Sequence, residues 1–289
     1  MRVVNSMAAN SMLRDLSVNT EKLSKLQEQV SSSRRINRPS DDPVGLVDSL
    51  RLRTGIDELA KYQKNAQDAQ SWMEATDSAL DDSGNIMQWI RELAVKSATV
   101  ILTQTERDAV NKEIAQLKQQ LIQISNSTYA GRYIFSGNKT HTEAYDSMGL
   151  YQGDDGVNQY EIGVGVKLPI NVTGTQVFGN MFTTLDKLMS DISAGSVENI
   201  SNVDLDQLDT VMNEQLYVRA DLGARINRAD LVIARADELT VNMSDLLSKT
   251  EDVDIAQVMM QLKIQESVYQ ASLQVGARII QPTLLDYLR

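Results

Sequence analysis

Three pairs of adjacent aspartates are the residues of this sequence that could carry chemistry. They are Asp41-Asp42, Asp81-Asp82 and Asp154-Asp155. Paired carboxylates can act as general acid and base or bind a divalent cation. Adjacent positions of a helix, however, point their side chains in different directions, and acidic residues at a helix start ordinarily cap it. Because Gly156 follows the third pair, that pair is typical of a turn. The spacing favours structural roles, and we predict no catalytic residue.

Few residues of this sequence fit other catalytic or metal-binding motifs. The chain has no cysteine and one histidine, His141, which excludes disulfides, thiolate zinc sites and two-histidine metal motifs. A Ser-His-Asp arrangement would formally survive, but His141 lies between two threonines in a polar stretch that is typical of a solvated loop. Gly163 and Gly165 lack the third glycine and the following helix of a dinucleotide-binding fingerprint. We therefore expect no enzyme activity, metal or cofactor.

The composition argues against nucleic-acid and membrane partners. The 289 residues include 28 basic and 39 acidic side chains, and the formal net charge of -11 opposes binding to a phosphate backbone. Residues 1–14 lack the apolar core of a secretory signal, and no apolar run is long enough to span a bilayer. We expect no nucleic-acid partner, no cleaved signal peptide and no membrane insertion.

The glycines mark an insert in the middle of the chain. Nine of the fifteen glycines lie in residues 136–204, which indicates a segment rich in turns. Within it, residues 159–172 alternate polar and apolar side chains, the period of a strand. The pattern predicts a β-rich insert between two glycine-poor flanks.

The flanks have the period of long helices. Apolar and small residues recur at alternating spacings of three and four in residues 59–97, 110–128 and 222–247, which is the heptad pattern of packed helices. We predict helices near 44–99, 105–130 and 205–249.

Capping residues support these helix boundaries. Asp42 before Pro43 is typical of an N-cap followed by proline at the first helical position. Thr103 with Glu106 fits a capping box. Gly131 can end the helix near residue 130.

Both chain ends also carry helical seams. The N-terminal seam runs from Ala9 to Val30 and the C-terminal seam from Ile255 to Ile279. A second stripe on the C-terminal segment gives that helix two apolar faces. Its members are Ile264, Val268, Ala271 and Val275. One face can pack on the N-terminal helix, and the other needs a further partner, which is the first indication of assembly.

These elements predict a mainly α chain that runs out and returns. Arms at opposite ends of a sequence can lie side by side only in that case, so we expect an elongated antiparallel helical rod or coiled coil formed by both chain ends, with the β-rich insert at its tip. The expected domains are residues 1–43 with 250–289 as a terminal assembly domain, 44–135 with 205–249 as a helical rod domain, and 136–204 as the insert.

Several sequence blocks resemble the bacterial flagellins and hook-associated proteins. Residues 31–45 read SSSRRINRPSDDPVG, similar to the motif near the start of these proteins, although Ser33 stands where many relatives carry glycine. The later blocks occur in the family's order. They are 91–94, 131–137, 222–228, 269–275 and 284–289. The resemblance covers both flanks but not the insert.

The resemblance implies a structural protein of the flagellum, located outside the cell and exported by the flagellar type III apparatus. Within the family, the 37–43 block and the Asp286 to Arg289 ending are most similar to the proteins of the hook-filament junction. These form a short ring between a hook-associated protein and the flagellin filament. The implied partners are the hook-associated protein, flagellin, further copies of this chain and a flagellar export chaperone. A flagellin filament subunit is the alternative.

The expected assembly interface combines the terminal seams, the second stripe and the charged motif. Arg34 and Arg35 are followed closely by Asp41 and Asp42, which indicates internal or intersubunit ion pairs. The full set is Leu16, Leu23, Leu26, Val30, Arg34, Arg35, Asp41, Asp42, Leu262, Ile264, Val268, Tyr269, Ala271, Val275, Ile279, Leu284, Leu285 and Leu288.

Overall fold

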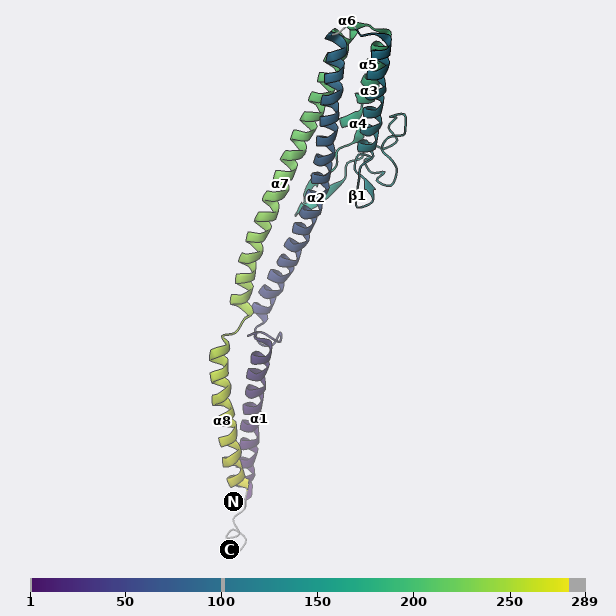
Figure 1. Cartoon of the computed structure of the whole chain (residues 1–289). Helices are drawn as coiled ribbons and strands as arrows, with labels where there is room; N and C mark the ends of the chain where they lie inside the picture. The colour runs from purple at the N-terminus through teal and green to yellow at the C-terminus, as the bar shows by residue number, and fades with distance from the viewer. Residues whose placement is uncertain (1, 100–101, 281–289) are drawn as a thin grey trace. The chain divides into compact units, whose positions relative to one another are not determined.

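The computed structural model describes residues 2–99 and 102–280, and this part of the chain is mainly helical (Figure 1). The elements in chain order are α1 (Arg2–Ser32), α2 (Pro43–Thr99), α3 (Gln104–Ser125), β1 (Thr128–Tyr129), β2 (Arg132–Tyr133), β3 (Gln159–Gly163), β4 (Val166–Pro169), α4 (Gly174–Phe178), α5 (Met181–Ala194), α6 (Val197–Asn199), the π-helical turn η1 (Ile200–Asp204), α7 (Leu205–Glu251) and α8 (Ile255–Ile280). The strands form two small antiparallel sheets. The predicted fold class is confirmed.

The chain divides into two compact units. The first unit combines the residues up to Asp57 with those from Thr240 onward, and the second unit is Glu58–Leu239. The long helices α2 and α7 contribute residues to both.

The first unit is built on α1 and α8, which lie side by side and antiparallel (Figure 1). The amide of Asn19 donates to the hydroxyl of Ser272 at 3.2 Å, and the amide of Gln265 donates to the side-chain oxygen of Asn19 at 3.3 Å. A Cβ atom on Gly276 would lie 3.2 Å from the terminal methyl carbon of Met12. The polar residues that interrupt the two seams therefore meet one another, and Gly276 gives room for Met12.

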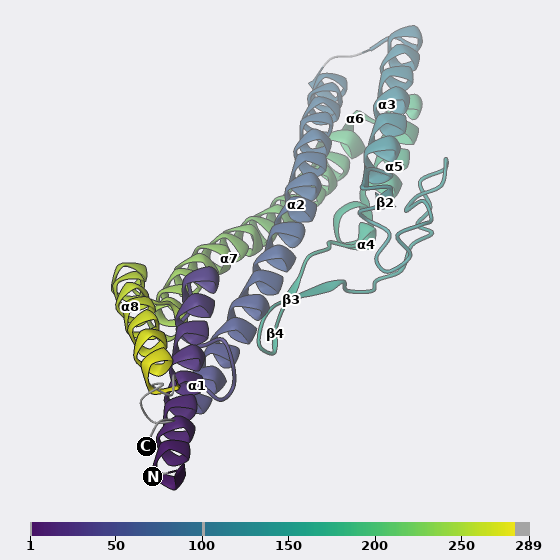
Figure 2. The same ribbon diagram turned by 90° about the horizontal axis from the view of Figure 1, so that it is seen from below.

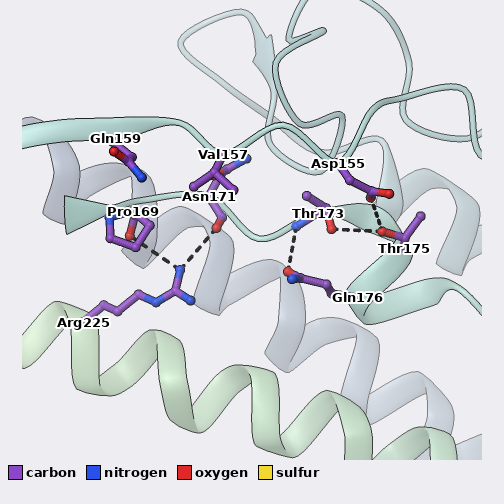
Figure 3. Close-up of a pocket in the computed structure, with 9 residues that line it drawn as sticks. All are labelled: Asp155, Val157, Gln159, Pro169, Asn171, Thr173, Thr175, Gln176 and Arg225. Carbon is purple, nitrogen blue, oxygen red and sulfur yellow. Dashed lines mark hydrogen bonds between the residues drawn. The ribbon is translucent and has the colours of Figure 1, made fainter. Parts of the chain in front are cut away.

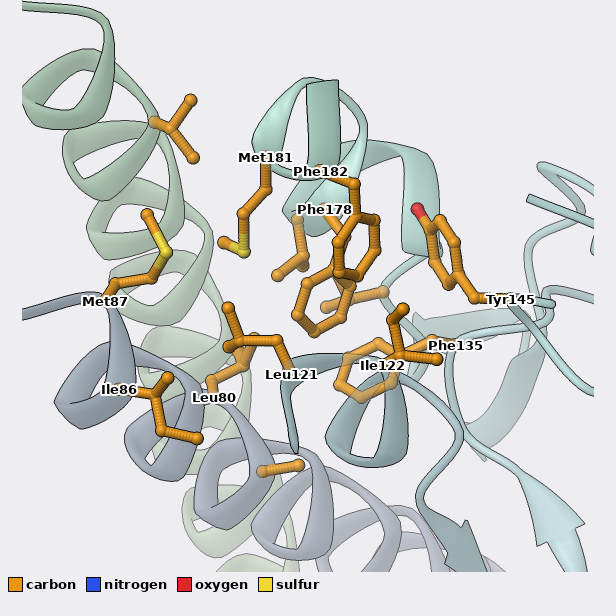
Figure 4. Packing of buried hydrophobic residues seen from close by; sticks show 14 of the residues in the cluster. Leu80, Ile86, Met87, Leu121, Ile122, Phe135, Tyr145, Phe178, Met181 and Phe182 are labelled. Carbon is orange, nitrogen blue, oxygen red and sulfur yellow. The ribbon is translucent and has the colours of Figure 1, made fainter. Parts of the chain in front are cut away.

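The second unit contains the main hydrophobic core. The predicted seam of α2 is buried without interruption from Ala66 to Ser97, and α3 adds buried residues at its heptad positions. Side chains of α4 and α5 complete the core, including Phe178 and Met181 (Figure 4). The buried ring of Tyr145 lies 5.0 Å from that of Phe182.

Two of the three boundary predictions are confirmed. The Asp42 side chain accepts a hydrogen bond from the backbone N–H of Gly45 at 2.9 Å, and α2 begins at Pro43. Thr103 and Glu106 form the predicted capping box at the start of α3.

The predicted end of α3 near residue 130 is wrong. The helix ends at Ser125, because the Asn126 side chain exchanges two hydrogen bonds with the backbone of Tyr145. Ala130 and Gly131 both have positive φ, +49° and +76°, and form the turn between β1 and β2. Gly131 therefore serves a hairpin turn rather than a helix end.

The alternating segment of the insert folds as a hairpin. β3 and β4 pair antiparallel, and Gly165 occupies the connecting turn with φ +69°. The hairpin lies beside α2 (Figure 2), where the amide of Asn65 donates to the carbonyl of Glu161 at 2.8 Å. The insert also contains α4 and α5, which the alternating pattern did not predict.

Candidate assembly site

The second apolar stripe of α8 is exposed within the described chain. Ile264 is 59% exposed, Val268 42% and Val275 52%, and Ala271 on the same stripe is exposed as well. Residues three or four positions apart lie on one helix face, so these side chains form a continuous apolar surface. Such a surface on a helix is typical of a contact with another protein.

The other apolar face of α8 packs on α1. Leu262 and Tyr269 are half-buried on the face that carries Gln265, which bonds to Asn19. The α1 residues that the sequence predicts for the interface are all half-buried as well. They are Leu16, Leu23, Leu26 and Val30. The structure therefore brings the two seams together within one chain.

Four residues of the predicted interface lie at or beyond the end of the described chain. Leu284, Leu285 and Leu288 lie outside the described residues. Ile279 belongs to the last turn of α8, and its side chain also lies outside the described part.

Arg34 lies at the corner where α1 meets the end of α7. Its guanidinium pairs with the carboxylate of Glu251 at 2.7 Å, and Arg53 of α2 pairs with the same carboxylate. The backbones of Arg34 and Asp252 also pair as an isolated antiparallel β-bridge. Glu251 is only 4% exposed, and a buried carboxylate needs such partners to offset its loss of hydration.

Arg35 ties the same corner to the start of α2. Its backbone N–H donates to the carbonyl of Glu251 at 2.6 Å, and its guanidinium donates to the carbonyl of Thr250 at 2.8 Å. The guanidinium also bonds to the carboxylate of Asp42 at 3.2 Å. The hydrogen bond from Gly45 N–H, followed by the Arg35 charge, lowers the pKa of Asp42.

Asp41 organises the loop between α1 and α2. Its carboxylate pairs with Lys25 at 2.8 Å and accepts the backbone N–H groups of Asn37 and Arg38 at 3.2 and 3.0 Å. The Lys25 bond is the main cause of a lowered pKa of Asp41. The ion pairs predicted for Arg34, Arg35, Asp41 and Asp42 thus all form within one chain.

Ser33 has an unusual backbone conformation at this corner. Its φ is +58°, in the left-handed region, and its carbonyl accepts the N–H of Val253 at 3.2 Å. Glycine adopts this conformation without steric cost. Glycine at this position would therefore relieve backbone strain that serine carries.

Glu251 is the residue of this site that sequence reasoning missed. Its two arginine partners lie about two hundred positions away, and no local spacing connects them. The available signal was its place at the end of a predicted helix in a chain expected to return toward Arg34.

Carboxylates of the other two aspartate pairs also have structural partners. Asp81 pairs with Arg219 of α7, and the Asp154 side chain accepts the N–H groups of Asn138 and Gly156. Residues 2–99 and 102–280 contain no cluster of three or more potential metal ligands. No helix among the described residues has the length and apolar character needed to cross a membrane.

One hollow of the second unit is lined by several polar side chains that bond to one another or to nearby backbone (Figure 3). Its volume is about 480 Å³. Arg225 donates to the carbonyls of Asn171 and Pro169, at 3.3 and 3.5 Å, and Thr175 donates to the carboxylate of Asp155. The bonds of Arg225 hold the insert against α7, and the bond of Thr175 lies within the insert. These are structural contacts, and their arrangement does not point to a reaction.

Comparisons with known proteins match both flanks. The model of the bacterial flagellin N-terminal helical region matches residues 3–140, and that of the bacterial flagellin C-terminal helical region matches residues 205–288. A flagellar filament 30.7 kDa core protein of Treponema maltophilum is 30% identical over 258 residues, 88% of this chain and 86% of that protein. A flagellin of Halalkalibacterium halodurans is 28% identical over 272 residues, 94% of this chain and 93% of that protein.

A solved structure is similar in fold. It is the putative flagellar hook-associated protein from Vibrio parahaemolyticus, with a TM-score of 0.68 and 21% sequence identity, and the alignment covers 73% of this chain and all of that one.

Proposed function

Because this chain belongs to the flagellin family, we propose that it is the structural subunit that joins the hook to the flagellin filament of a bacterial flagellum. The observation that carries this role is the loop of residues 37–43, whose sequence resembles that of junction proteins and whose Asp41 and Asp42 fix the start of α2. The similarity in fold to a hook-associated protein supports the same role. We propose a structural function without catalysis.

Assembly depends on the α1–α8 pair. The seams between the two helices hold one subunit together, while the stripe from Ile264 to Val275 is free to pack on a neighbouring copy. Burying exposed branched side chains stabilises an interface by about 25 cal/mol per Å². Because each subunit makes several such contacts in a ring, the ring holds its subunits firmly even when each pairwise interface is weak. The proposed surface also includes Ile279, Leu284, Leu285 and Leu288.

The junction needs two different neighbours. One end of the ring contacts a hook-associated protein and the other contacts flagellin, and a flagellar export chaperone protects the chain before assembly. The protein would reach this place outside the cell through the flagellar type III apparatus. We assign assembly to residues 1–43 and 250–289. Lateral and axial contacts belong to residues 44–135 and 205–249, and the insert of residues 136–204 faces solvent.

A filament subunit is the second candidate. The names of two relatives favour it, since one is a flagellin and the other a flagellar filament core protein, and each aligns over most of its length. A filament subunit would use the same α8 surface but would repeat it along the whole filament.

Deleting the gene distinguishes the two roles. We expect cells with hooks but no filaments, and flagellin shed into the medium, by electron microscopy and by analysis of the culture supernatant. Restoring the gene should restore motility. Missing filaments with no shed flagellin would instead identify this chain as the flagellin. Normal filaments would contradict both roles.

A further inference from the structure

Two adjacent methionines near the start of α8 are exposed to solvent. Met260 is 64% exposed and Met259 is 44% exposed, whereas Met73 and Met87 in the core of the second unit are fully buried. Oxidants reach an exposed thioether more readily than one that close packing encloses. The two α8 methionines are therefore candidates for oxidation in the folded chain.

Only one of these two methionines lies on the exposed apolar stripe of α8. Met260 precedes Ile264 by four positions, and residues four positions apart share a helix face, so Met260 extends the stripe by one turn. Met259 is rotated from Met260 by about 100° around the helix axis, away from Ile264. The pair therefore places one sulfur atom on the proposed contact surface and one beside it.

Peroxide converts a methionine thioether into a sulfoxide. The sulfur attacks one oxygen of hydrogen peroxide, the O–O bond breaks, and the other oxygen leaves as water after taking the proton of the first. The sulfur is oxidised by two electrons and the peroxide is reduced by the same two. The product carries a polar S–O group in place of an apolar sulfur, and burying that group in an apolar contact without a donor is costly.

We propose that Met260 is a peroxide-sensitive modification site whose sulfoxide blocks the assembly surface of α8. Because Met260 is mostly exposed in the single subunit, water can solvate the sulfoxide oxygen there, and the fold is unaffected. The cost arises when a second copy covers the stripe. Oxidation at this position therefore acts on assembly rather than on folding, an inference that rests on the proposed role of α8 in assembly.

Treatment of the purified, unassembled full-length protein with hydrogen peroxide tests this assignment. Sedimentation should show about a tenfold loss of assembled material after treatment. Peptide mass spectrometry should find an added oxygen on Met260, while Met73 and Met87 stay unmodified. A methionine sulfoxide reductase should restore assembly, using a dithiol that becomes a disulfide as the oxygen leaves as water.

Two leucine variants separate Met260 from its neighbour. Leucine has nearly the volume of methionine and no sulfur, so Met260→Leu and Met259→Leu should both assemble as the wild type does before treatment. After treatment, Met260→Leu should keep its assembly and Met259→Leu should lose it about tenfold. Equal losses in the two variants, a wild-type Met260 that stays unmodified, or normal assembly of wild type oxidised at Met260 would overturn the proposal.

The assembled protein gives an independent measurement. A second copy packed on the stripe should shield Met260, so its oxidation should be slower in assembled than in unassembled material. Met148, a methionine of the insert that is 74% exposed, should react at the same rate in both. Equal rates for Met260 in the two states would contradict its place in the contact.

A lysine on the same stripe distinguishes failure of this proposal from failure of the α8 surface itself. If Val268→Lys assembled at wild-type level, the α8 surface would be wrong and the role of Met260 with it. If Val268→Lys blocked assembly while peroxide did not act through Met260, only the present proposal would fail. The gene deletion tests the junction role without reference to either result.

Discussion

At the residue scale, one corner of the first unit concentrates most of the unusual features. Ser33 has a left-handed backbone, Glu251 is a buried carboxylate shared by two arginines, and Asp41 gathers Lys25 with two backbone N–H groups. Each feature fixes a change of direction of the chain. The corner therefore requires particular residue types at these positions, whereas a regular helix accepts many.

Ser33→Gly should stabilise the first unit. A left-handed backbone costs a non-glycine residue about 1 kcal/mol or more, and this relief exceeds the added entropy of glycine in the unfolded chain. Amide protection in α1 and α8 should rise by about threefold in hydrogen exchange. Ser31→Gly, placed inside α1, should lower it. Equal effects of the two substitutions would contradict the assignment of strain to Ser33.

Acid should weaken the corner through Asp41. Because the pKa of Asp41 is lowered in the folded chain, its contribution is complete above its ordinary value of 3.8 and is lost as the pH falls through the lowered value. Protection of α1 and α8 should fall as the pH drops below this ordinary value. Asp41→Asn should make this fall shallower, and an unchanged profile would argue against the Lys25 pair.

Glu251→Gln should destabilise the first unit. The change removes the charge that pairs with Arg34 and Arg53, although both arginines are partly exposed and can regain hydration. We expect a loss of about 1–2 kcal/mol, measured by hydrogen exchange of α1 and α8. Glu266→Gln breaks an exposed pair with Lys263 and should cost less than about 0.5 kcal/mol.

At the element scale, α8 separates two tasks by helix face. Tyr269 packs toward α1, whereas Val268, its neighbour in sequence, is exposed. Successive helix positions differ by about 100°, so adjacent residues can serve different surfaces. This arrangement allows folding and assembly to be tested separately.

Val268→Lys should block assembly and leave the subunit folded. A lysine on the exposed stripe would have to be buried without a partner when copies pack together. We expect unchanged helicity by circular dichroism and at least a tenfold loss of assembled material in sedimentation. Tyr269→Ala should instead lower the hydrogen-exchange protection of α1 and α8, because this side chain packs toward α1 within one subunit. Assembly of the Val268 variant at wild-type level would remove α8 from the proposed interface.

At the scale of the whole molecule, the charge is unevenly divided. The first unit contains 13 basic and 13 acidic residues, whereas the second contains 15 and 26. The whole net charge of the chain thus belongs to the second unit. Neighbouring copies can bring neutral first units together while their second units repel.

Assembly should therefore respond to salt. Raising the ionic strength from about 0.02 to 0.15 M shortens the screening length from about 20 to 8 Å and weakens this repulsion. Light scattering should show faster assembly at the higher salt concentration. The Val268→Lys variant should gain little, because its defect lies in the neutral unit. Slower assembly of the wild type with added salt would indicate that attraction between charges drives it.

The sequence by itself determined what depends on near neighbours along the chain. Heptad spacing predicted α2, α7 and the two faces of α8, and the cap at Asp42 followed from the types of two adjacent residues. These features are local because a helix repeats its contacts every three or four positions. The sequence motifs also identified the segment of the corner that carries Arg34, Arg35 and Asp41.

Only the tertiary structure decided which distant groups meet. It paired Glu251 with Arg34 and Arg53, buried Asp204 beside α5, and ended α3 at Ser125 through the contact of Asn126 with Tyr145. It also added α4 and α5 to an insert whose pattern predicted strands. No spacing rule specifies such contacts, because the energy of each depends on burial and partners that exist only once the chain has folded.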